Sequence, residues 1–357
     1  MDLSIYQKIF SKLNQNRLGY GLDVRDPELK KDWSSAYGLI ASAELNLNQL
    51  FQHNKSTENI EHCISWLIKN KGCKSTHAPC WGVPFKRSIW TDQEPVKENT
   101  SFAIPTCHAI QALCEFYESN NRNNEILKIA NDAAIYFAKN CYDKHENNIA
   151  FWYSPLEQHS FHVNNSISML AGIIQKVHKL SQTNDLLEEQ ATKAISYILK
   201  TKKNVNGLLG WNYFGLKIPP NKTNRPNDLL HDAFMCHGLI EYKQNNGSIS
   251  NRYTYEELYN SFKKFIQNDI IYEFPIEYKI QSEARLWGIS HGLYIVSRLE
   301  KILNIKKNLS EIFYKVFQKY YMNENLSILM TPKGAVADNH VRQIAHTLLG
   351  ISYYLNI

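Results

Sequence analysis

Ionisable and polar side chains gather where several amphipathic segments of this chain begin. Asp228 and His231 lie three positions apart, so on a helix they share a face. The carboxylate can then orient the imidazole and raise its basicity. Asp338 and Arg342 lie four positions apart, a spacing that suits an ion pair. We predict these four residues as the catalytic group, with Asp228 and His231 as an acid/base unit facing the other two across a cavity.

Two kinds of saccharide chemistry fit these residue types. A glycosidase needs two carboxylates on either side of a sugar, one of them protonated, and Asp228 with Asp338 or Glu283 would supply them. A uronate lyase needs side chains that neutralise a carboxylate, together with a His or Tyr base. The residues that suit a lyase are His162, Asn164, Asn165, His231 and Arg342. The residue types leave both reactions open.

Aromatic residues recur in the long connecting segments. The segments 80–85, 151–153 and 210–213 resemble one another, and each contains a Trp. Aromatic faces stack on sugar rings, although the same side chains can instead anchor the loops to the helices. The predicted substrate-binding residues are Trp81, Phe85, Trp152, His162, Asn164, Asn165, Trp211, Glu283, Arg285 and His340.

Each of these residues also has a purely structural interpretation. Asp and Ser commonly cap helices, which would account for Asp228, Ser160, Ser282 and Asp338. The pair formed by Asp338 and Arg342 suits a helix-stabilising surface salt bridge. Histidines two turns inside a helix are typically hydrogen-bonded core residues, which is the interpretation we favour for His237, His291 and His346.

A zinc site is suggested by the sequence Cys236-His237-Gly238, with Cys80 as a third ligand. Adjacent residues on a helix point about 100° apart, however, so both can ligate one ion only at a helix end or a distortion. These residues lie in the middle of a helical pattern. We therefore predict no metal and no other cofactor.

Helical periodicity dominates the chain. Twelve helices are expected near residues 2–15, 33–53, 57–70, 102–119, 124–140, 160–181, 185–202, 228–244, 253–267, 283–303, 307–323 and 338–356. Short and long gaps alternate between them. Short gaps make antiparallel helical hairpins, so the long gaps join one hairpin to the next.

The two helices of each hairpin differ in composition. Segments such as 228–244 are apolar all round, which is typical of buried helices, whereas segments such as 124–140 have one apolar stripe. The pattern predicts an all-α (α/α)6 toroid spanning residues 1–357 as one domain, with an inner ring inside an outer one. Long loops containing short extended segments then meet at one face, where a site is expected because loops and helix N-termini carry function.

Composition narrows the possible partners. The chain has 40 basic and 34 acidic residues, and its Lys residues are scattered, which argues against a nucleic-acid partner. The N-terminal segment lacks the apolar core of a signal peptide, and no stretch reaches the roughly 18 apolar residues of a membrane span. We expect a cytoplasmic protein whose partner is a saccharide. Its seven cysteines are odd in number and lie mostly in helical patterns, so no disulfide framework is expected.

The chain resembles the six-hairpin (α/α)6-toroid superfamily, and within it uncharacterised bacterial proteins of polysaccharide-biosynthesis gene clusters. The residues that carry the resemblance lie in segments 80–85, 164–165, 210–213, 227–242 and 338–343. The resemblance implies the toroid fold and a glycan context. It does not imply one reaction, since the superfamily includes hydrolases, lyases and epimerases.

A second toroid family, the lanthionine-synthetase cyclases, is similar at Cys236-His237-Gly238, but here Cys80 precedes Trp81 instead of following it. We therefore expect a carbohydrate-active enzyme that hydrolyses or eliminates across a glycosidic bond in surface-polysaccharide metabolism. The alternatives are a non-catalytic glycan-binding or scaffold protein of polysaccharide assembly and a zinc-dependent cyclase-like enzyme.

Overall fold

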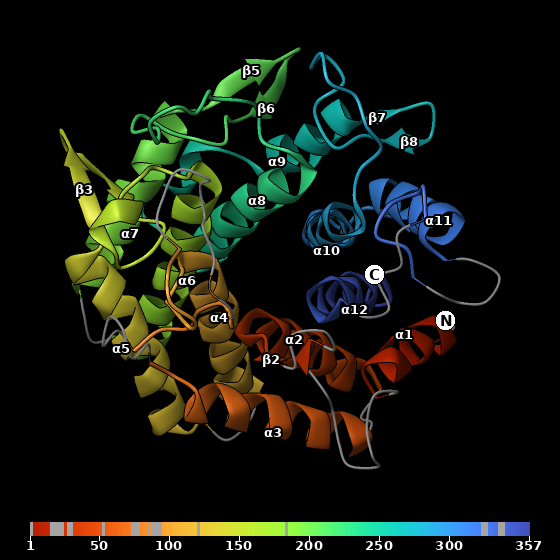
Figure 1. Cartoon of the computed structure of the whole chain (residues 1–357), viewed down its shortest axis with the longest axis horizontal. Coiled ribbons are helices and arrows are strands. Elements are labelled where there is room, and N and C mark those ends of the chain that lie inside the picture. Colours follow the sequence, from red (N-terminus) through yellow and green to blue (C-terminus); the bar gives the residue numbers. More distant parts are fainter. Residues whose placement is uncertain are drawn as a thin grey trace.

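The computed structural model describes residues 3–14, 25–26, 31–51, 54–72, 79–84, 86, 95–119, 122–182, 185–322, 328–334 and 340–357. Twelve α-helices in these ranges form two concentric rings (Figure 1). The inner helices are α2 (Ser34–Phe51), α4 (Ala103–Ser119), α6 (Asn164–Ser181), α8 (Leu229–Gln244), α10 (Leu286–Leu303) and α12 (Val341–Tyr354). The outer helices are α1 (Ser4–Asn14), α3 (Asn54–Lys69), α5 (Asn124–Asn140), α7 (Asp185–Lys200), α9 (Tyr255–Ser261) and α11 (Leu309–Tyr321).

The inner ring is closed by packing between the two ends of the chain. Each inner helix packs against the next one in sequence, and α12 packs against α2. Helix α1 packs against α12 and completes the sixth pair, so the N- and C-termini lie near each other (Figure 1). The all-α toroid predicted from the sequence is therefore confirmed.

Burial explains which helices lie inside. In α2 every residue from Ser34 to Leu47 is buried, because this helix is surrounded by other helices. In α11 the buried positions include Leu309, Phe313, Val316 and Phe317, which follow the spacing of a single apolar stripe. Small residues at the interfaces of the inner ring allow its helices to approach closely.

Gly172 of α6 and Gly238 of α8 mark the closest approach of two inner helices. A Cβ atom added at Gly172 would lie 2.1 Å from the carbonyl oxygen of Gly238, and one added at Gly238 would lie 2.1 Å from that of Ser168. Backbone packs directly on backbone here. Larger side chains at these positions would force the two helices apart.

Among the described residues, four two-stranded hairpins lie in the connections. They are β1 (Arg25–Asp26) with β2 (Lys31–Asp32), β3 (Tyr142–His145) with β4 (Asn148–Phe151), β5 (Lys203–Val205) with β6 (Leu208–Gly210), and β7 (Ile266–Gln267) with β8 (Ile270–Ile271). All are antiparallel, and β3 pairs with β4 so that Tyr142 faces Phe151. The second and third hairpins end next to Trp152 and Trp211, so the predicted extended segments in the long loops are confirmed.

Several helix starts and ends differ from the predicted ones. Helix α6 begins at Asn164 instead of Ser160, because Ser160 ends a 3-10 turn, Glu157–His159, and the extended Val163 pairs with Phe214. Helix α10 begins at Leu286, after an extended Arg285. The N-cap positions of α6 and α10 are therefore Val163 and Arg285, and not Ser160 and Ser282. Helix α9 ends at Ser261 and continues as a 3-10 turn, Phe262–Phe265. Asp228 does cap α8, as predicted.

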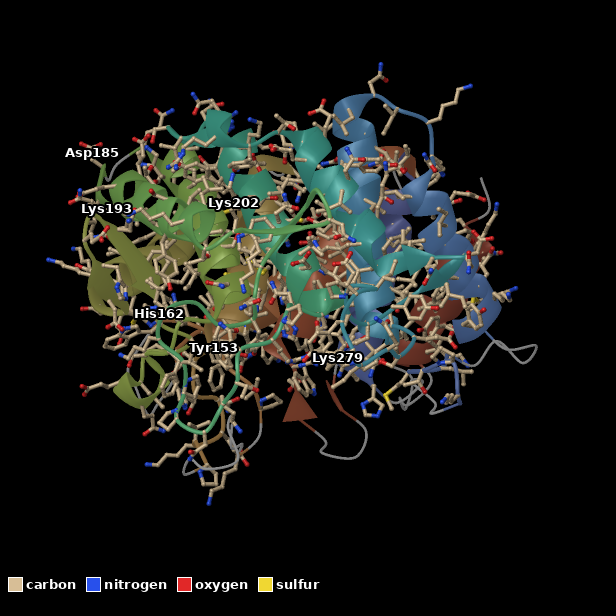
Figure 2. All side chains as sticks on the ribbon, turned by 90° about the horizontal axis from the view of Figure 1, so that it is seen from above. Tyr153, His162, Asp185, Lys193, Lys202 and Lys279 are labelled. Atoms are coloured by element: carbon tan, nitrogen blue, oxygen red, sulfur yellow. The ribbon has the colours of Figure 1, made fainter. Side chains whose placement is uncertain are left out.

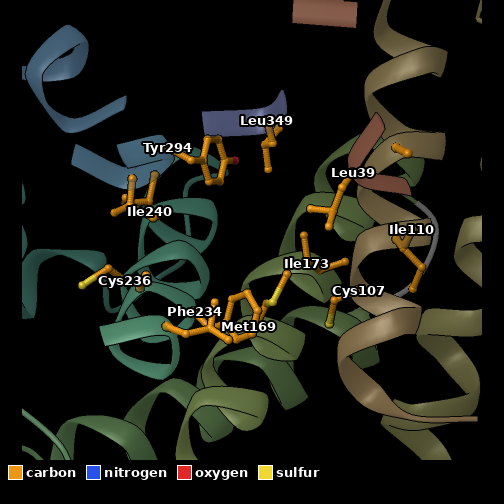
Figure 3. Close-up of a cluster of buried hydrophobic side chains, with 14 of the residues drawn as sticks. Leu39, Cys107, Ile110, Met169, Ile173, Phe234, Cys236, Ile240, Tyr294 and Leu349 are labelled. Atoms are coloured by element: carbon orange, nitrogen blue, oxygen red, sulfur yellow. The ribbon is translucent and has the colours of Figure 1, made fainter. Parts of the chain in front are cut away.

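The centre of the toroid is filled by side chains of the inner helices. Figure 3 shows Leu39, Ile173, Tyr294 and Leu349 pointing into it from four of them. The loop-bearing face lies at one end of this filled centre. In Figure 2, Tyr153, His162 and Lys279 of the long loops lie toward the lower side, and Asp185 at the start of α7 lies on the upper side.

Candidate active site

A cavity of about 250 Å³ opens where the N-terminal ends of the inner helices converge. All six inner helices or the residues just before them contribute to its wall. The lining residues are Trp33, Ser35, Val83, Phe102, Ile104, Pro105, His108, Tyr153, Asn165, Tyr213, Arg225, Asp228, Leu230, His231, Phe234, Arg285, Trp287, Arg342 and His346. The wall therefore combines aromatic faces with cationic and neutral polar groups.

Asp228 and His231 form a tightly bonded pair in this wall. The Asp228 side chain is fully buried, and its Oδ1 lies 2.6 Å from His231 Nδ1. The same oxygen accepts the backbone N–H of His231 at 3.1 Å, so the helix cap also fixes the position of the imidazole. With Nδ1 engaged, His231 has Nε2 available to a bound molecule.

The ionised form of Asp228 is stabilised by its neighbours. Burial raises the pKa of this carboxyl, but His231, its hydrogen bonds and Arg285 together lower the pKa below its usual value. Guanidinium nitrogens of Arg225 and Arg285 each lie 3.6 Å from Asp228 Oδ2. A carboxylate held in this way accepts the Nδ1 proton of His231 and favours the tautomer whose Nε2 is basic.

Two arginines are stacked on one indole ring. The guanidinium carbon of Arg285 lies 4.6 Å from the ring centroid of Trp287, and that of Arg342 lies 4.3 Å from it. Arg342 also lies 5.5 Å from the ring of Trp33. Stacking of this kind fixes the plane of a guanidinium, whose N–H groups point outward in that plane.

Arg285 has a further support behind the wall. Its Nε donates to Glu273 Oε1 at 2.7 Å, and its backbone N–H donates to Glu273 Oε2 at 2.8 Å. Arg225 lies 5.5 Å from the ring of Tyr213, which itself packs edge-on against His231 at 4.8 Å. Each arginine of the cavity is thus oriented by a neighbour.

The charges of the described lining residues do not cancel. Three arginines line the cavity, and Asp228 is the single carboxylate among the described residues of its wall. Adding Glu273 behind Arg285 still leaves one positive charge in excess. Such a cavity favours a monoanionic ligand.

The floor of the cavity contains neutral histidines. Burial lowers the pKa of His108 to about 3, with a further contribution from Arg342. Burial also lowers the pKa of His346 well below its usual value, assisted by His291, His108 and Arg342. Both rings are therefore uncharged at neutral pH and can donate or accept hydrogen bonds as neutral groups.

Several buried nitrogens of the wall have no hydrogen-bond partner among the described residues. They are both ring nitrogens of His108, Nδ2 of Asn165 and Nε1 of Trp287. Buried polar groups are rarely left without partners in folded proteins. Their gathering around one cavity indicates a ligand with several oxygen atoms.

The structure brings five of the predicted site residues together in this wall: Asn165, Asp228, His231, Arg285 and Arg342. Phe85 and Asp338 lie outside the described residues. Glu283 and His340 are described but do not line the cavity, since Glu283 pairs with Tyr272 through its backbone and His340 precedes the first turn of α12.

The predicted Trp residues lie away from the cavity. Trp81 and Trp211 are each 2% exposed. Their indole N–H groups donate to the carbonyls of Leu67 in α3 and Ile198 in α7, at 3.0 and 3.1 Å. Trp152 donates to Asp143 at 2.9 Å. The contacts of Trp81 and Trp211 anchor loops to the outer ring, and that of Trp152 holds the segment after β4 against β3. All three agree with the second interpretation of the aromatic residues.

His162 and Asn164 hold a loop that contributes to the wall. His162 is fully buried, with Nε2 at 3.2 Å from Asp143 and Nδ1 at 2.9 Å from the Tyr197 hydroxyl. Asn164 donates to the carbonyl of Asn212 at 2.9 Å. Both side chains therefore position segment 211–227, which brings Tyr213 and Arg225 to the cavity.

Sequence reasoning did not select Trp33, Tyr213, Arg225 or Trp287. Trp33 directly precedes α2 and Trp287 is the second residue of α10, so the start of an inner helix was an available signal for both. Tyr213 and Arg225 lie in an irregular loop. Their place depends on the contacts of that loop, which no periodicity reveals.

The suggested zinc ligands diverge. Cys236 points away from the centre of the toroid (Figure 3), and its Sγ lies 3.7 Å from the hydroxyl of Ser261. His237 Nε2 instead lies 3.3 Å from the hydroxyl of Tyr294. Within the described ranges, no three His, Cys, Asp or Glu side chains are placed to hold a metal ion.

In the same ranges, no helix is long and apolar enough to cross a membrane.

The fold places the chain in a structural class, the six-hairpin (α/α)6 toroids. No family model matches the sequence, and no curated protein matches it. A solved structure of a possible member of the GH105 family from Salmonella enterica is similar, with 12% identity, a TM-score of 0.67, and coverage of 99% of this chain and 93% of that one.

Two other solved structures show the same likeness. Cellobiose 2-epimerase from Bacillus thermoamylovorans is 12% identical, with a TM-score of 0.63 and coverage of 95% of each chain. A GH76 α-mannanase from Bacteroides thetaiotaomicron is 10% identical, with a TM-score of 0.66 and coverage of 99% of this chain and 96% of that one. At these identities the likeness establishes the shared toroid fold.

Proposed function

We propose that this protein is an enzyme that acts on an anionic saccharide and removes a proton from a carbon atom next to its carboxylate. The observation that carries the proposal is the pair formed by His231 and Asp228, 2.6 Å apart, in a cavity with three arginines. The base and the anion-binding groups share one wall.

The chemistry follows from the two kinds of group. Arg285 and Arg342, stacked on Trp287, bind the substrate carboxylate through guanidinium N–H groups. His231 Nε2 takes the proton from the adjacent carbon, and the electron pair moves into the carboxylate, where the guanidiniums stabilise the added charge. The resulting carbanion equivalent has two outcomes. It expels the glycosidic oxygen at the next carbon, which takes a proton from the imidazolium of His231 or from water, or it is reprotonated on the other face by a proton from solvent.

Elimination and epimerisation thus share their first step. The described arrangement of side chains suits both of them better than it suits hydrolysis. A hydrolase of the two-carboxylate type needs a second carboxylate opposite Asp228. Asp228 is the one carboxylate among the described residues of the wall. The proposed roles of Asp228, His231 and Arg342 retain the acid/base unit and the facing cation that the sequence suggests.

The names of the structural neighbours support a saccharide substrate. They include a possible GH105 member, a cellobiose 2-epimerase and an α-mannanase. We place the substrate in surface-polysaccharide metabolism, on the support of the sequence resemblance alone. The unpartnered nitrogens of His108, Asn165 and Trp287 would form hydrogen bonds with the hydroxyl groups of the sugar.

The test is turnover of a panel of uronate-containing and neutral oligosaccharides by the purified protein. Elimination is read from the ultraviolet absorbance of an unsaturated uronate, and epimerisation from deuterium uptake at carbon in D2O by NMR. We expect His231→Gln to lower kcat by about 10²–10⁴-fold, the contribution of a general base.

The matched control is His178→Gln, since His178 lies near the C-terminal end of α6 and pairs with Glu188 at 3.5 Å. Binding of a uronate without any product would favour the non-catalytic glycan-binding alternative. Full activity of the His231→Gln variant would show that another group is the base.

A further inference from the structure

Tyr294 of α10 is the centre of a hydrogen-bond chain beneath the cavity. Its hydroxyl accepts from Arg298 Nη1 at 2.7 Å and from Gln111 Nε2 at 3.2 Å. Arg has no acceptor, and the Gln111 nitrogen is identified as a donor by its second bond, to a carboxylate oxygen of Glu115 at 2.8 Å. Both lone pairs of the hydroxyl are therefore occupied, and its proton must point elsewhere.

That proton has one acceptor within reach. His237 Nε2 lies 3.3 Å from the Tyr294 hydroxyl. Because this nitrogen accepts, the neutral His237 ring must have its own proton on Nδ1. Burial lowers the pKa of His237 well below its usual value, and the positive charge of Arg298 lowers it further. Both effects are consistent with a neutral ring.

The next ring in the chain is His291. The His237 and His291 ring centroids lie 5.5 Å apart. The Nδ1 atom of His237 and the Nε2 atom of His291 are both buried without a hydrogen-bond partner among the described residues. These two atoms do not bond to each other directly. One water that accepts from His237 Nδ1 and donates to His291 Nε2 would satisfy both.

His291 then determines the state of His346. Their Nδ1 atoms lie 3.3 Å apart, so one donates and the other accepts. If His291 Nε2 accepts from that water, the His291 proton lies on Nδ1 and is donated to His346 Nδ1. The proton of His346 is then on Nε2, the nitrogen that remains for the cavity that this residue lines.

We propose that Arg298, Tyr294, His237 and His291 are positioning residues that hold His346 in its Nε2–H tautomer, so that His346 donates a hydrogen bond to the substrate. His231 has the opposite polarity, because its Nδ1 donates to Asp228 and leaves Nε2 as an acceptor. The cavity therefore presents one imidazole acceptor and one imidazole donor.

The catalytic part of this inference rests on the proposed function. When His231 removes the proton, negative charge develops on the substrate carboxylate or carbonyl oxygen. A neutral imidazole N–H at that oxygen stabilises the charge without transferring its proton. The hydrogen-bond chain therefore supplies no proton to the reaction. Its role is to hold the Nε2–H group of His346 in place.

The tautomers are tested without any substrate, by NMR of protein labelled with 15N-histidine. We expect protonated Nδ1 in His231, His237 and His291, and protonated Nε2 in His346. A protonated Nδ1 in His346 would overturn the inference. Individual rings are assigned from single His→Gln variants.

Tyr294→Phe removes the hydroxyl that starts the chain. His237 Nε2 then has Glu241 at 3.8 Å as its nearest carboxylate and is expected to become the protonated nitrogen. The ring signals of His237, His291 and His346 should change together. Tyr353→Phe is the matched control, because the Tyr353 ring packs on that of Tyr294 at 4.6 Å and takes no part in the chain. Unchanged signals in Tyr294→Phe would also overturn the inference.

Turnover adds a second readout. We expect Tyr294→Phe to lower kcat by about 10-fold with KM unchanged, part of the 10²–10³-fold loss that follows removal of an oxyanion donor. The Tyr353→Phe variant should retain the wild-type kcat. If the wild-type protein turns over no saccharide, the proposed function fails, while the NMR result still decides the tautomers.

Discussion

At the scale of single residues, the site depends on pairs of side chains that orient each other. Asp228 caps α8 and also bonds to the ring of His231, so one carboxylate serves helix stability and imidazole orientation. Arg285 and Arg342 share Trp287 as a stacking surface. A guanidinium has a planar, bidentate set of N–H donors, which a lysine lacks.

Arg342 tests this view of anion binding. We expect Arg342→Lys to lower kcat/KM for a uronate oligosaccharide by about 10- to 100-fold, because a hydrogen bond to a charged group contributes about 1.5–3 kcal/mol. The measurement is steady-state kinetics at low and high salt. Arg252→Lys is the control, as Arg252 lies on an exposed turn. Equal losses in both variants, or none in Arg342→Lys, would remove the arginine from substrate binding.

At the scale of elements, the inner helices place the site because their backbones are in contact. Gly172 and Gly238 allow α6 and α8 to approach closely enough that Asn165 and His231 face one cavity. The long loops add to this frame. Segment 211–227 is held by His162 and Asn164, and brings Tyr213 and Arg225 to the rim.

Gly238→Ala should destabilise the protein. The added Cβ would meet the Ser168 carbonyl oxygen at 2.1 Å, and we expect a loss of about 1–3 kcal/mol in the free energy of unfolding, as for overpacked cores. Urea denaturation measures it. In the control Gly288→Ala, the nearest atoms lie at 3.5 Å, so that variant should be neutral or slightly stabilised by higher helix propensity. Equal stability of the two variants would contradict the close approach of α6 and α8.

At the scale of the whole molecule, closing the ring buries a cluster of histidines near its axis. His108, His237, His291 and His346 come from three different hairpins and α12, and all are buried. Burial lowers the pKa of each, to about 3 for His108. Charging any of them inside the toroid is unfavourable.

Stability should therefore depend on pH. These histidines stay neutral in the folded protein but take up protons near pH 6.5 when the chain unfolds, so the unfolded state binds more protons below that pH. The free energy of unfolding is unaffected by them above pH 6.5 and falls as the pH is lowered from 6.5 toward 4. Each contributes a slope of up to about 1.4 kcal/mol per pH unit.

Urea denaturation across this pH range measures the slope. His108→Gln should reduce it by about 1.4 kcal/mol per pH unit, since one titrating group is removed. His178→Gln, with its partly exposed ring, serves as the control. A slope that does not differ between wild type and His108→Gln would show that His108 is protonated in the folded state.

Much of the architecture could be predicted because it depends on local periodicity. The alternation of short and long gaps indicated six hairpins, and the contrast between helices apolar all round and helices with one stripe separated the two rings. The capping role of Asp228 and its pairing with His231 followed from a three-residue spacing within one helix. These features involve residues that are close in the sequence, so spacing alone determines their geometry.

Contacts between distant segments were decided by the tertiary structure. Trp81 and Trp211 resembled sugar-stacking residues, but their N–H groups donate to helix-end carbonyls of the outer ring. His346 resembled an ordinary core histidine, yet it lines the cavity and contacts His291 of another hairpin. Trp and His side chains have both apolar and polar parts, so the same residue type can either stabilise the fold or contact a ligand. Closure of the ring determines which partners lie within hydrogen-bond distance of such a side chain, and therefore which of the two roles it has.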